Sequence, residues 1–175
     1  MFDDPRTPLA GVRRHDLPRS ADTLPSLPPG AAPAATLLAT IDRHLALARR
    51  AGQHLALLAV TLDPPAPDAA APPPALVEAL AVEFGNRLRA RVRASDTVLW
   101  QGGCNHLVLL QPCRHAGAMA ARLRLEKALG GIYRLGQTRL AASASIGCAS
   151  YPAAGDTATQ LLAAALAAAR GDTSR

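Results

Sequence analysis

The amino-acid sequence predicts an α+β fold of the ferredoxin-like class, with a central, mainly antiparallel sheet flanked by helices. Three observations support this class. The spacing of apolar residues changes along the chain in the order helix, strand, helix, strand, strand, helix, strand, helix. The 175 residues are 49% apolar, which is enough to form one core. Aromatic residues make up only 3% of the chain, so that core must consist of Leu, Val and Ala.

The first half of the chain is expected to contain an arm, two helices, a strand and a loop. Residues 1–33 are rich in Pro, Arg and Asp without apolar periodicity, which predicts a disordered arm. Helical spacing predicts a helix from residue 34 until Gly52 stops it, and the almost continuous apolar run of residues 54–62 predicts a buried central strand. Prolines exclude both elements over residues 63–74, which should form a stiff loop. An i, i+4 stripe predicts a second helix over residues 75–94.

The second half should contain two strands, a helix, a third strand and a last helix, over residues 97–101, 106–111, 114–129, 138–150 and 156–170. The first two of these strands are joined through Gly102-Gly103. Asp156 is expected to cap the last helix at its N-terminus. The predicted domain therefore covers residues 34–171, and residues 172–175 form a short tail.

The chain is basic, with 19 Lys and Arg residues against 13 Asp and Glu residues and a formal net charge of +6. Nearly all of the basic residues are Arg, whose planar fork suits phosphates and the edges of guanine. The codon bias of a GC-rich genome explains the same basicity equally well. No nucleic-acid polymer is expected as a partner.

Several features of the sequence bear on location. No apolar run approaches the ~18 residues of a membrane span. The N-terminus begins with acidic residues and has no apolar segment of the secretory type. Three cysteines, an odd number, fit reduced thiols. We therefore expect a cytoplasmic protein without a membrane span.

Residues 93–110, RASDTVLWQGGCNHLVLL, are the most informative part of the chain. They resemble the central hairpin of GGDEF domains, the diguanylate cyclase family that makes the bacterial second messenger cyclic di-GMP. The signature pentapeptide of that family, Gly-Gly-Asp/Glu-Glu-Phe, lies on a tight turn between two strands. Here the pentapeptide consists of Gly102, Gly103, Cys104, Asn105 and His106. The glycines are kept and both acidic side chains are absent, so the motif is degenerate.

A second segment supports the resemblance. Ser145-Ile146-Gly147, Tyr151-Pro152 and Gly155-Asp156 are similar to the closing stretch of the family, in which a Ser-Ile-Gly strand and a Tyr-Pro turn lead into a last helix. The resemblance then extends from about Thr36 to Arg170. It implies a nucleotidyl cyclase fold, which is the ferredoxin-like arrangement predicted above.

The resemblance also implies where synthesis would need carboxylates. Family members place one carboxylate for Mg²⁺ at the end of the first strand and one at the third letter of the pentapeptide. The matching positions here are Thr61 and Cys104, and the glutamate at the reacting centre is replaced by Asn105. The segment that contacts the guanine of GTP is replaced by the Pro/Ala loop after Asp63. We therefore expect no Mg²⁺, no other cofactor and no cyclase activity, and we expect His106 to pack where the family has Phe.

The regulatory signature is kept. Arg93 and Asp96 restore the Arg-x-x-Asp product site of the family at its usual offset from Gly102. An Arg fork can bind guanine O6/N7 or a phosphate, and a carboxylate can accept hydrogen bonds from guanine N1 and N2. A further arginine from the next helix completes the site in the family, and either Arg122 or Arg124 fits this role. The alternative is a solvated ion pair between Arg93 and Asp96 worth less than ~1 kcal/mol.

Three functions follow from these residues. The first is a catalytically inactive receptor that binds cyclic di-GMP and signals to an unidentified protein partner. The second is a nucleotide-independent adaptor built on the same fold, and the third, a weak enzyme, is kept only formally. A homodimer is left open. No metal is expected, because Cys104 and Cys113 of the two Cys-x-His pairs are about 30 Å apart along an extended strand.

Overall fold

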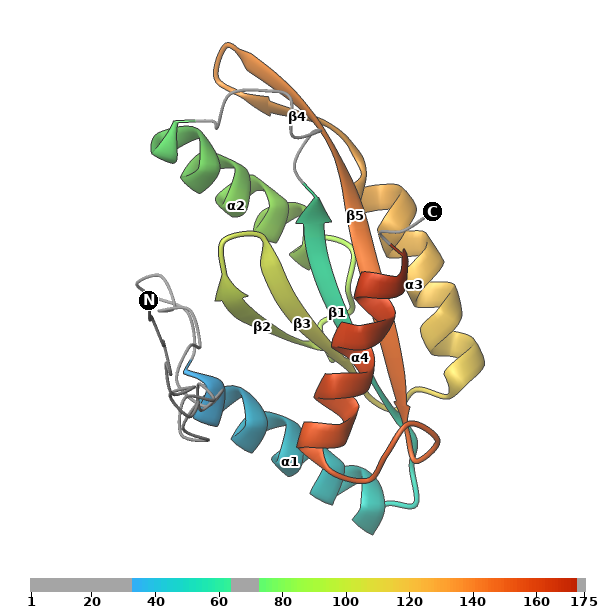
Figure 1. The fold of residues 1–175 in the computed structure, drawn as a ribbon. Coiled ribbons are helices and arrows are strands. Elements are labelled where there is room, and N and C mark those ends of the chain that lie inside the picture. Colours follow the sequence, from blue (N-terminus) through green and yellow to red (C-terminus); the bar gives the residue numbers. More distant parts are fainter. Residues whose placement is uncertain (1–32, 64–72, 173–175) are drawn as a thin grey trace, which may run out of the picture.

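A computed structural model describes residues 33–63 and 73–172. The predicted arm, the middle of the Pro/Ala loop and the end of the predicted tail lie outside these residues. The elements are α1 (Ala34–Arg50), β1 (Leu55–Asp63), α2 (Pro74–Arg89), β2 (Thr97–Gly102), β3 (Asn105–Leu110), α3 (His115–Leu129), β4 (Gly131–Leu135), β5 (Thr138–Tyr151) and α4 (Ala158–Asp172). The strands form one sheet in the order β2-β3-β1-β5-β4, and every neighbouring pair is antiparallel. The predicted α+β fold is confirmed (Figure 1).

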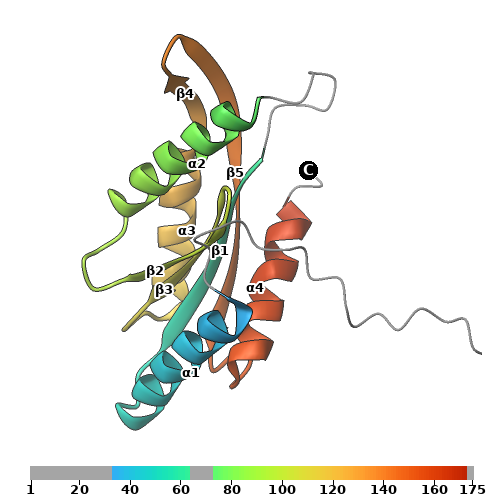
Figure 2. The ribbon, with the colours of Figure 1, turned by 90° about the vertical axis from the view of Figure 1, so that its left-hand side faces the viewer.

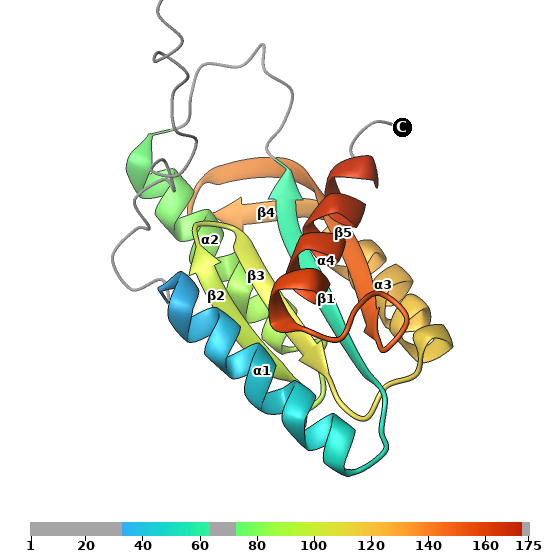
Figure 3. The same cartoon turned by 60° about the horizontal axis from the view of Figure 1, so that its bottom comes forward.

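Helices cover both faces of the sheet (Figure 2). Along β1, Leu58 and Val60 face the core under α2 and α3, whereas Leu57 and Ala59 face the core under α1 and α4. Alternate side chains of β1 therefore enter two different cores, and both sets are buried. This explains why the strand has a continuous apolar sequence rather than an alternating one. Helices α1 and α4 lie side by side over one face (Figure 3).

One strand was not predicted. β4 (Gly131–Leu135) follows α3 directly and pairs with the first residues of β5. Its sequence is short and mostly exposed, and only Tyr133 is fully buried. In the sequence, Gly130-Gly131 indicates only the end of the helix predicted over residues 114–129. The β4–β5 hairpin turns at Gly136, whose φ of 63° lies in the left-handed region that favours glycine.

Two of the helix ends that differ from the prediction have a visible local cause. α2 ends at Arg89, not at residue 94, because the chain turns between Arg93 and Asp96. α4 begins at Ala158, and its side-chain cap is Thr157 rather than Asp156. The Thr157 hydroxyl accepts the Gln160 N–H at 3.2 Å, and the Gln160 side chain accepts the Thr157 N–H at 3.3 Å. This reciprocal pair is a capping box. In the part of the chain that the structure describes, no helix has the length and hydropathy of a membrane crossing.

Candidate functional site

The turn between β2 and β3 keeps its two glycines for a conformational reason. Gly102 has a φ of 106° and Gly103 a φ of 52°, both of which L side chains rarely adopt. Two side chains form hydrogen bonds with backbone carbonyls of the turn. The Trp100 Nε1–H donates to the Gly103 carbonyl at 2.8 Å, and the Asn105 amide donates to the Gly102 carbonyl at 3.3 Å. Trp100 and Asn105 therefore stabilise the hairpin itself.

The positions at which synthesis would need carboxylates lie next to each other. Thr61 is paired with Asn105 across β1 and β3, and the Thr61 hydroxyl donates to the Asn105 carbonyl oxygen at 3.1 Å. The Cys104 carbonyl accepts the Leu62 N–H at 3.2 Å. Thus the fold brings Thr61, Cys104 and Asn105 together, but they present a hydroxyl, a thiol and an amide instead of charged oxygens.

The Cys104 thiol and the Asp63 carboxylate at the end of β1 are both poorly suited to bind a metal ion. Burial raises the pKa of Cys104 to about 11, so it stays protonated at neutral pH. Asp63, two residues beyond Thr61, accepts a hydrogen bond from the Ser145 hydroxyl at 2.5 Å at the end of β1. Across residues 33–63 and 73–172, no three His, Cys, Asp or Glu side chains are grouped as metal ligands.

His106 packs beneath the turn as expected. It is 2% exposed, and its ring meets Phe84 edge to face with 5.4 Å between ring centroids. Burial, followed by the charge of Arg89, lowers the pKa of His106 to about 4. Its Nδ1 has no hydrogen-bond partner among the described residues. The imidazole is therefore neutral and unsatisfied on at least one side.

Arg93 and Asp96 form a turn rather than an ion pair. The Asp96 carboxylate accepts the backbone N–H of Arg93 at 2.9 Å, and the Arg93 carbonyl accepts the Asp96 N–H at 3.0 Å. The exposed Arg93 guanidinium makes no hydrogen bond or salt bridge with the rest of the described chain. The alternative of a solvated ion pair between the two side chains is therefore not formed in this structure. Cys113 precedes α3, and burial raises its pKa. The charges of Asp96 and Arg93 also act on this thiol, so it lies near the turn.

The two candidate arginines of α3, Arg122 and Arg124, make different contacts. The Arg124 guanidinium donates to the Arg91 carbonyl at 3.4 Å, so it reaches the connection that carries Arg93 and Asp96. Arg122 lies 4.0 Å from Glu126 of the same helix and is half-buried. Arg124 therefore has a direct contact with the connection that carries Arg93 and Asp96.

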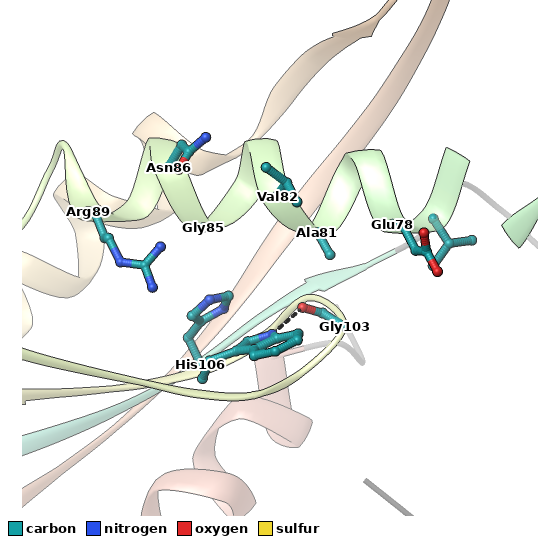
Figure 4. A pocket seen from close by; sticks show the side chains of 10 residues that line it. Glu78, Ala81, Val82, Gly85, Asn86, Arg89, Gly103 and His106 are labelled. Atoms are coloured by element: carbon teal, nitrogen blue, oxygen red, sulfur yellow. Dashed lines mark hydrogen bonds between the residues drawn. The ribbon is translucent and has the colours of Figure 1, made fainter. Parts of the chain in front are cut away.

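Sequence reasoning missed a cavity of about 650 Å³ between α2 and the hairpin (Figure 4). Its walls include Gly85 and Arg89 of α2. One signal was available, because a glycine inside a helix is ~1 kcal/mol less favourable than alanine and usually marks a place where space is needed.

No protein-family model matches the chain. Over 87 residues, half of the chain, the sequence is 34% identical to the bifunctional diguanylate cyclase/cyclic di-GMP phosphodiesterase MucR of Pseudomonas aeruginosa. The matched segment is only 13% of the length of MucR.

Solved structures with the same fold cover most of the chain. A sensory box/GGDEF family protein from Caulobacter crescentus is 27% identical, with a TM-score of 0.66 over 81% of this chain and 93% of that one. The GGDEF domain of FimX from Pseudomonas aeruginosa has a TM-score of 0.71 over 83% of this chain and 92% of that one. Its identity is 19%, so it supports the fold alone.

Proposed function

Since the chain is a GGDEF-like domain, we propose that it is a catalytically inactive receptor for cyclic di-GMP that acts in the cytoplasm. One observation carries this proposal. The Asp96 carboxylate closes its own turn through the backbone of Arg93, and this leaves the Arg93 guanidinium exposed and without a partner in the described chain. An arginine held in this way by its backbone can receive a ligand without breaking an existing ion pair.

The chemistry of the turn suits a guanine nucleotide. The Arg93 fork can donate two hydrogen bonds to guanine O6 and N7 or to a phosphate. The second oxygen of Asp96 can accept from guanine N1 or N2, because only one oxygen is used within the turn. Arg124, which already contacts the backbone of this connection, supplies a second positive charge for a phosphate.

The proposed inactivity rests on the residues at the strand end and the turn. Joining two molecules of GTP requires Mg²⁺ on phosphate oxygens, and Mg²⁺ prefers carboxylate and other hard oxygen ligands. Thr61 and Asn105 satisfy each other with a neutral hydrogen bond, and Cys104 is a protonated thiol. None of these three positions carries a carboxylate that could hold the metal ion or exchange a proton.

A calorimetric titration of the full chain tests the receptor proposal. Cyclic di-GMP should bind saturably, with the same affinity in Mg²⁺ and in a chelator, and an excess of GTP should not displace it. Absence of heat with cyclic di-GMP at tens of micromolar protein would reject the receptor proposal and leave the nucleotide-independent adaptor. Formation of cyclic di-GMP from GTP in the presence of Mg²⁺ would reject the proposal that the domain is catalytically inactive.

A further inference from the structure

The cavity between α2 and the hairpin is a second candidate site, distinct from the turn of Arg93 and Asp96. Its volume of about 650 Å³ falls within the ~300 to 1,000 Å³ that is usual for small-molecule sites. Neither Arg93 nor Asp96 lines it, and neither does Arg124. Its walls come from one face of α2 and from the hairpin, and consist of Val77, Glu78, Ala81, Val82, Gly85, Asn86, Arg89, Trp100, Gly103 and His106.

One wall of the cavity is apolar. Val77 and Val82, which both line the cavity, are 41% and 64% exposed. Trp100 forms the opposite side, and its only polar group already donates to the Gly103 carbonyl at 2.8 Å. The indole therefore offers the cavity only its apolar surface. A flat apolar group between Trp100 and the two valines would remove all three from water.

The other end of the cavity is polar and converges on Gly85. A Cβ atom at Gly85 would lie 3.4 Å from His106 Nε2 and 3.5 Å from Arg89 Nη1. These are ordinary van der Waals distances, so the imidazole and the guanidinium both lie against the helix at Gly85. Figure 4 shows both side chains directed toward the space between α2 and the hairpin.

His106 contributes one polar atom to the cavity wall. It is 2% exposed and lines the cavity, and its Nε2 is the ring nitrogen beside Gly85. Its Nδ1 is unpaired among the described residues but exposes less than 1 Å², so it does not border the cavity. A proton on Nε2 leaves the buried Nδ1 as the bare nitrogen and places the N–H donor at the cavity wall. The low pKa of His106 keeps the ring neutral, and Arg89 carries the positive charge. A neutral imidazole has one N–H donor, and the guanidinium adds more.

We propose that this cavity binds a small organic anion with a flat apolar body, such as an aromatic carboxylate. The carboxylate accepts hydrogen bonds from Arg89 and His106, and the ring lies against Trp100 and the valines. Glu78 lies eleven residues before Arg89 on α2, about 16 Å away along the helix axis. Its negative charge disfavours a second anionic group at that end, so the ligand carries its charge at the Arg89 end only.

The first experiment compares two probes of the same shape, one an anionic carboxylate and the other its neutral amide. The full chain is titrated with 2-naphthoate and with 2-naphthamide by calorimetry. Because Trp100 is the single tryptophan, its indole N–H gives one NMR signal that reports the cavity directly. We expect saturable binding of naphthoate, at least tenfold weaker binding of the amide, and a shift of the Trp100 signal.

Three variants assign the binding to the cavity. Arg89→Gln should lower the affinity for naphthoate about tenfold and leave the affinity for the amide unchanged. Arg91→Gln is the matched control, because it removes the same charge two residues away from a side chain that does not line the cavity. Ala81→Leu fills the cavity from the helix and should abolish binding of both probes. Each variant is checked by circular dichroism and thermal melting before titration.

Several outcomes would overturn the proposal. Equal affinity for the acid and the amide would mean that Arg89 and His106 do not select an anion. Equal losses in Arg89→Gln and Arg91→Gln would mean a diffuse charge effect. Displacement of naphthoate by GTP would make the cavity a remnant of a nucleotide site. A protein that dimerises through this face and takes up neither probe would show that a second copy, not a small anion, covers the groove.

Discussion

A methyl group on Gly147 of β5 would overlap the carbonyl oxygen of Ala165 in α4. The same methyl group would also lie 2.9 Å from the Ala169 Cα, so helix and strand meet backbone to backbone at this point. Contacts of this kind cannot be relieved by rotating a side chain. The glycine of the Ser-Ile-Gly segment is therefore a packing residue, and it sets how closely α4 approaches the sheet.

Gly147→Ala should destabilise the domain by about 3 kcal/mol, because α4 must shift away from β5 and leave gaps in the core. Urea denaturation of the full chain measures this cost. Gly171→Ala is the matched control, since it makes the same change in α4 with open space around the new methyl group. The control should be neutral or slightly stabilising, because alanine is the better helix former. Equal stabilities of the two variants would contradict the close packing.

His106 should make the fold sensitive to acid. Its pKa falls from 6.5 to about 4 on folding, so the unfolded chain binds the proton at a higher pH than the folded chain. Stability should therefore be constant above the unfolded pKa and decline as the pH drops from about 6.5 to about 4. The loss is on the order of 2 to 3 kcal/mol once both states are protonated. Urea denaturation at several pH values across this range measures it.

His106→Phe is the control for that pH dependence. Phenylalanine fits against Phe84 without an unpaired nitrogen, so the variant should be at least as stable as the wild type at neutral pH. Its stability curve should be flatter between about pH 6.5 and pH 4, because the titrating group is gone. An unchanged slope in this variant would assign the acid sensitivity to other groups.

The sequence predicted the fold well because the signals that decide it are local. The continuous apolar run of β1 is buried as its pattern required. Of the predicted stripe on α2, Leu80, Phe84 and Leu88 are buried, whereas Leu76 near the start of the helix is only half-buried. β4 escaped prediction because it depends on pairing with β5, and its own residues are too few and too exposed to show a period. The end of α2 escaped because Arg-rich residues favour helix, whereas the Asp96 carboxylate stabilises a turn at Arg93.

The site was predictable only in part, for the same reason. The resemblance to the family placed Thr61 and Cys104 at the two metal positions, and the structure pairs Thr61 with Asn105, the next residue after Cys104. The choice between Arg122 and Arg124 depends on how α3 lies against the connection after α2, which no local pattern encodes. The cavity beside Gly85 likewise requires two elements that are brought together only by the fold.

Restoring the acidic letters should not restore synthesis. Cys104→Asp with Asn105→Glu places two carboxylates on the turn, but Thr61 still contributes only a hydroxyl at the end of β1. We expect no cyclic di-GMP from GTP with Mg²⁺ or Mn²⁺ in either the wild type or the double variant, measured by chromatography of the nucleotides. Adding Thr61→Asp to the double variant tests whether the absence of metal ligands is the only reason for inactivity. Product from the double variant would show that the strand-end carboxylate is dispensable.

The receptor proposal predicts a specific set of losses at the turn. Arg93→Ala removes the exposed guanidinium and should lower the affinity for cyclic di-GMP by about thirtyfold, which corresponds to about 2 kcal/mol of binding free energy. Arg124→Ala should weaken it by about fivefold, since it removes one phosphate contact. Asp96→Asn keeps an oxygen to accept the Arg93 N–H, so it tests the negative charge without opening the turn. Calorimetry measures all three variants.

The control for these losses must remove a charge without touching the fold. Arg87 is unsuitable, because its guanidinium lies 3.9 Å from the Tyr133 ring centre and donates to the Ile132 carbonyl. Arg139 is exposed on β5 beside the β4–β5 turn, and its side chain makes no hydrogen bond or salt bridge within the described residues, so Arg139→Ala should bind like the wild type. Diffuse attraction by a basic surface would instead weaken all of the arginine variants alike and fall steeply with salt. Only losses confined to Arg93, Asp96 and Arg124 are consistent with a ligand held at the turn.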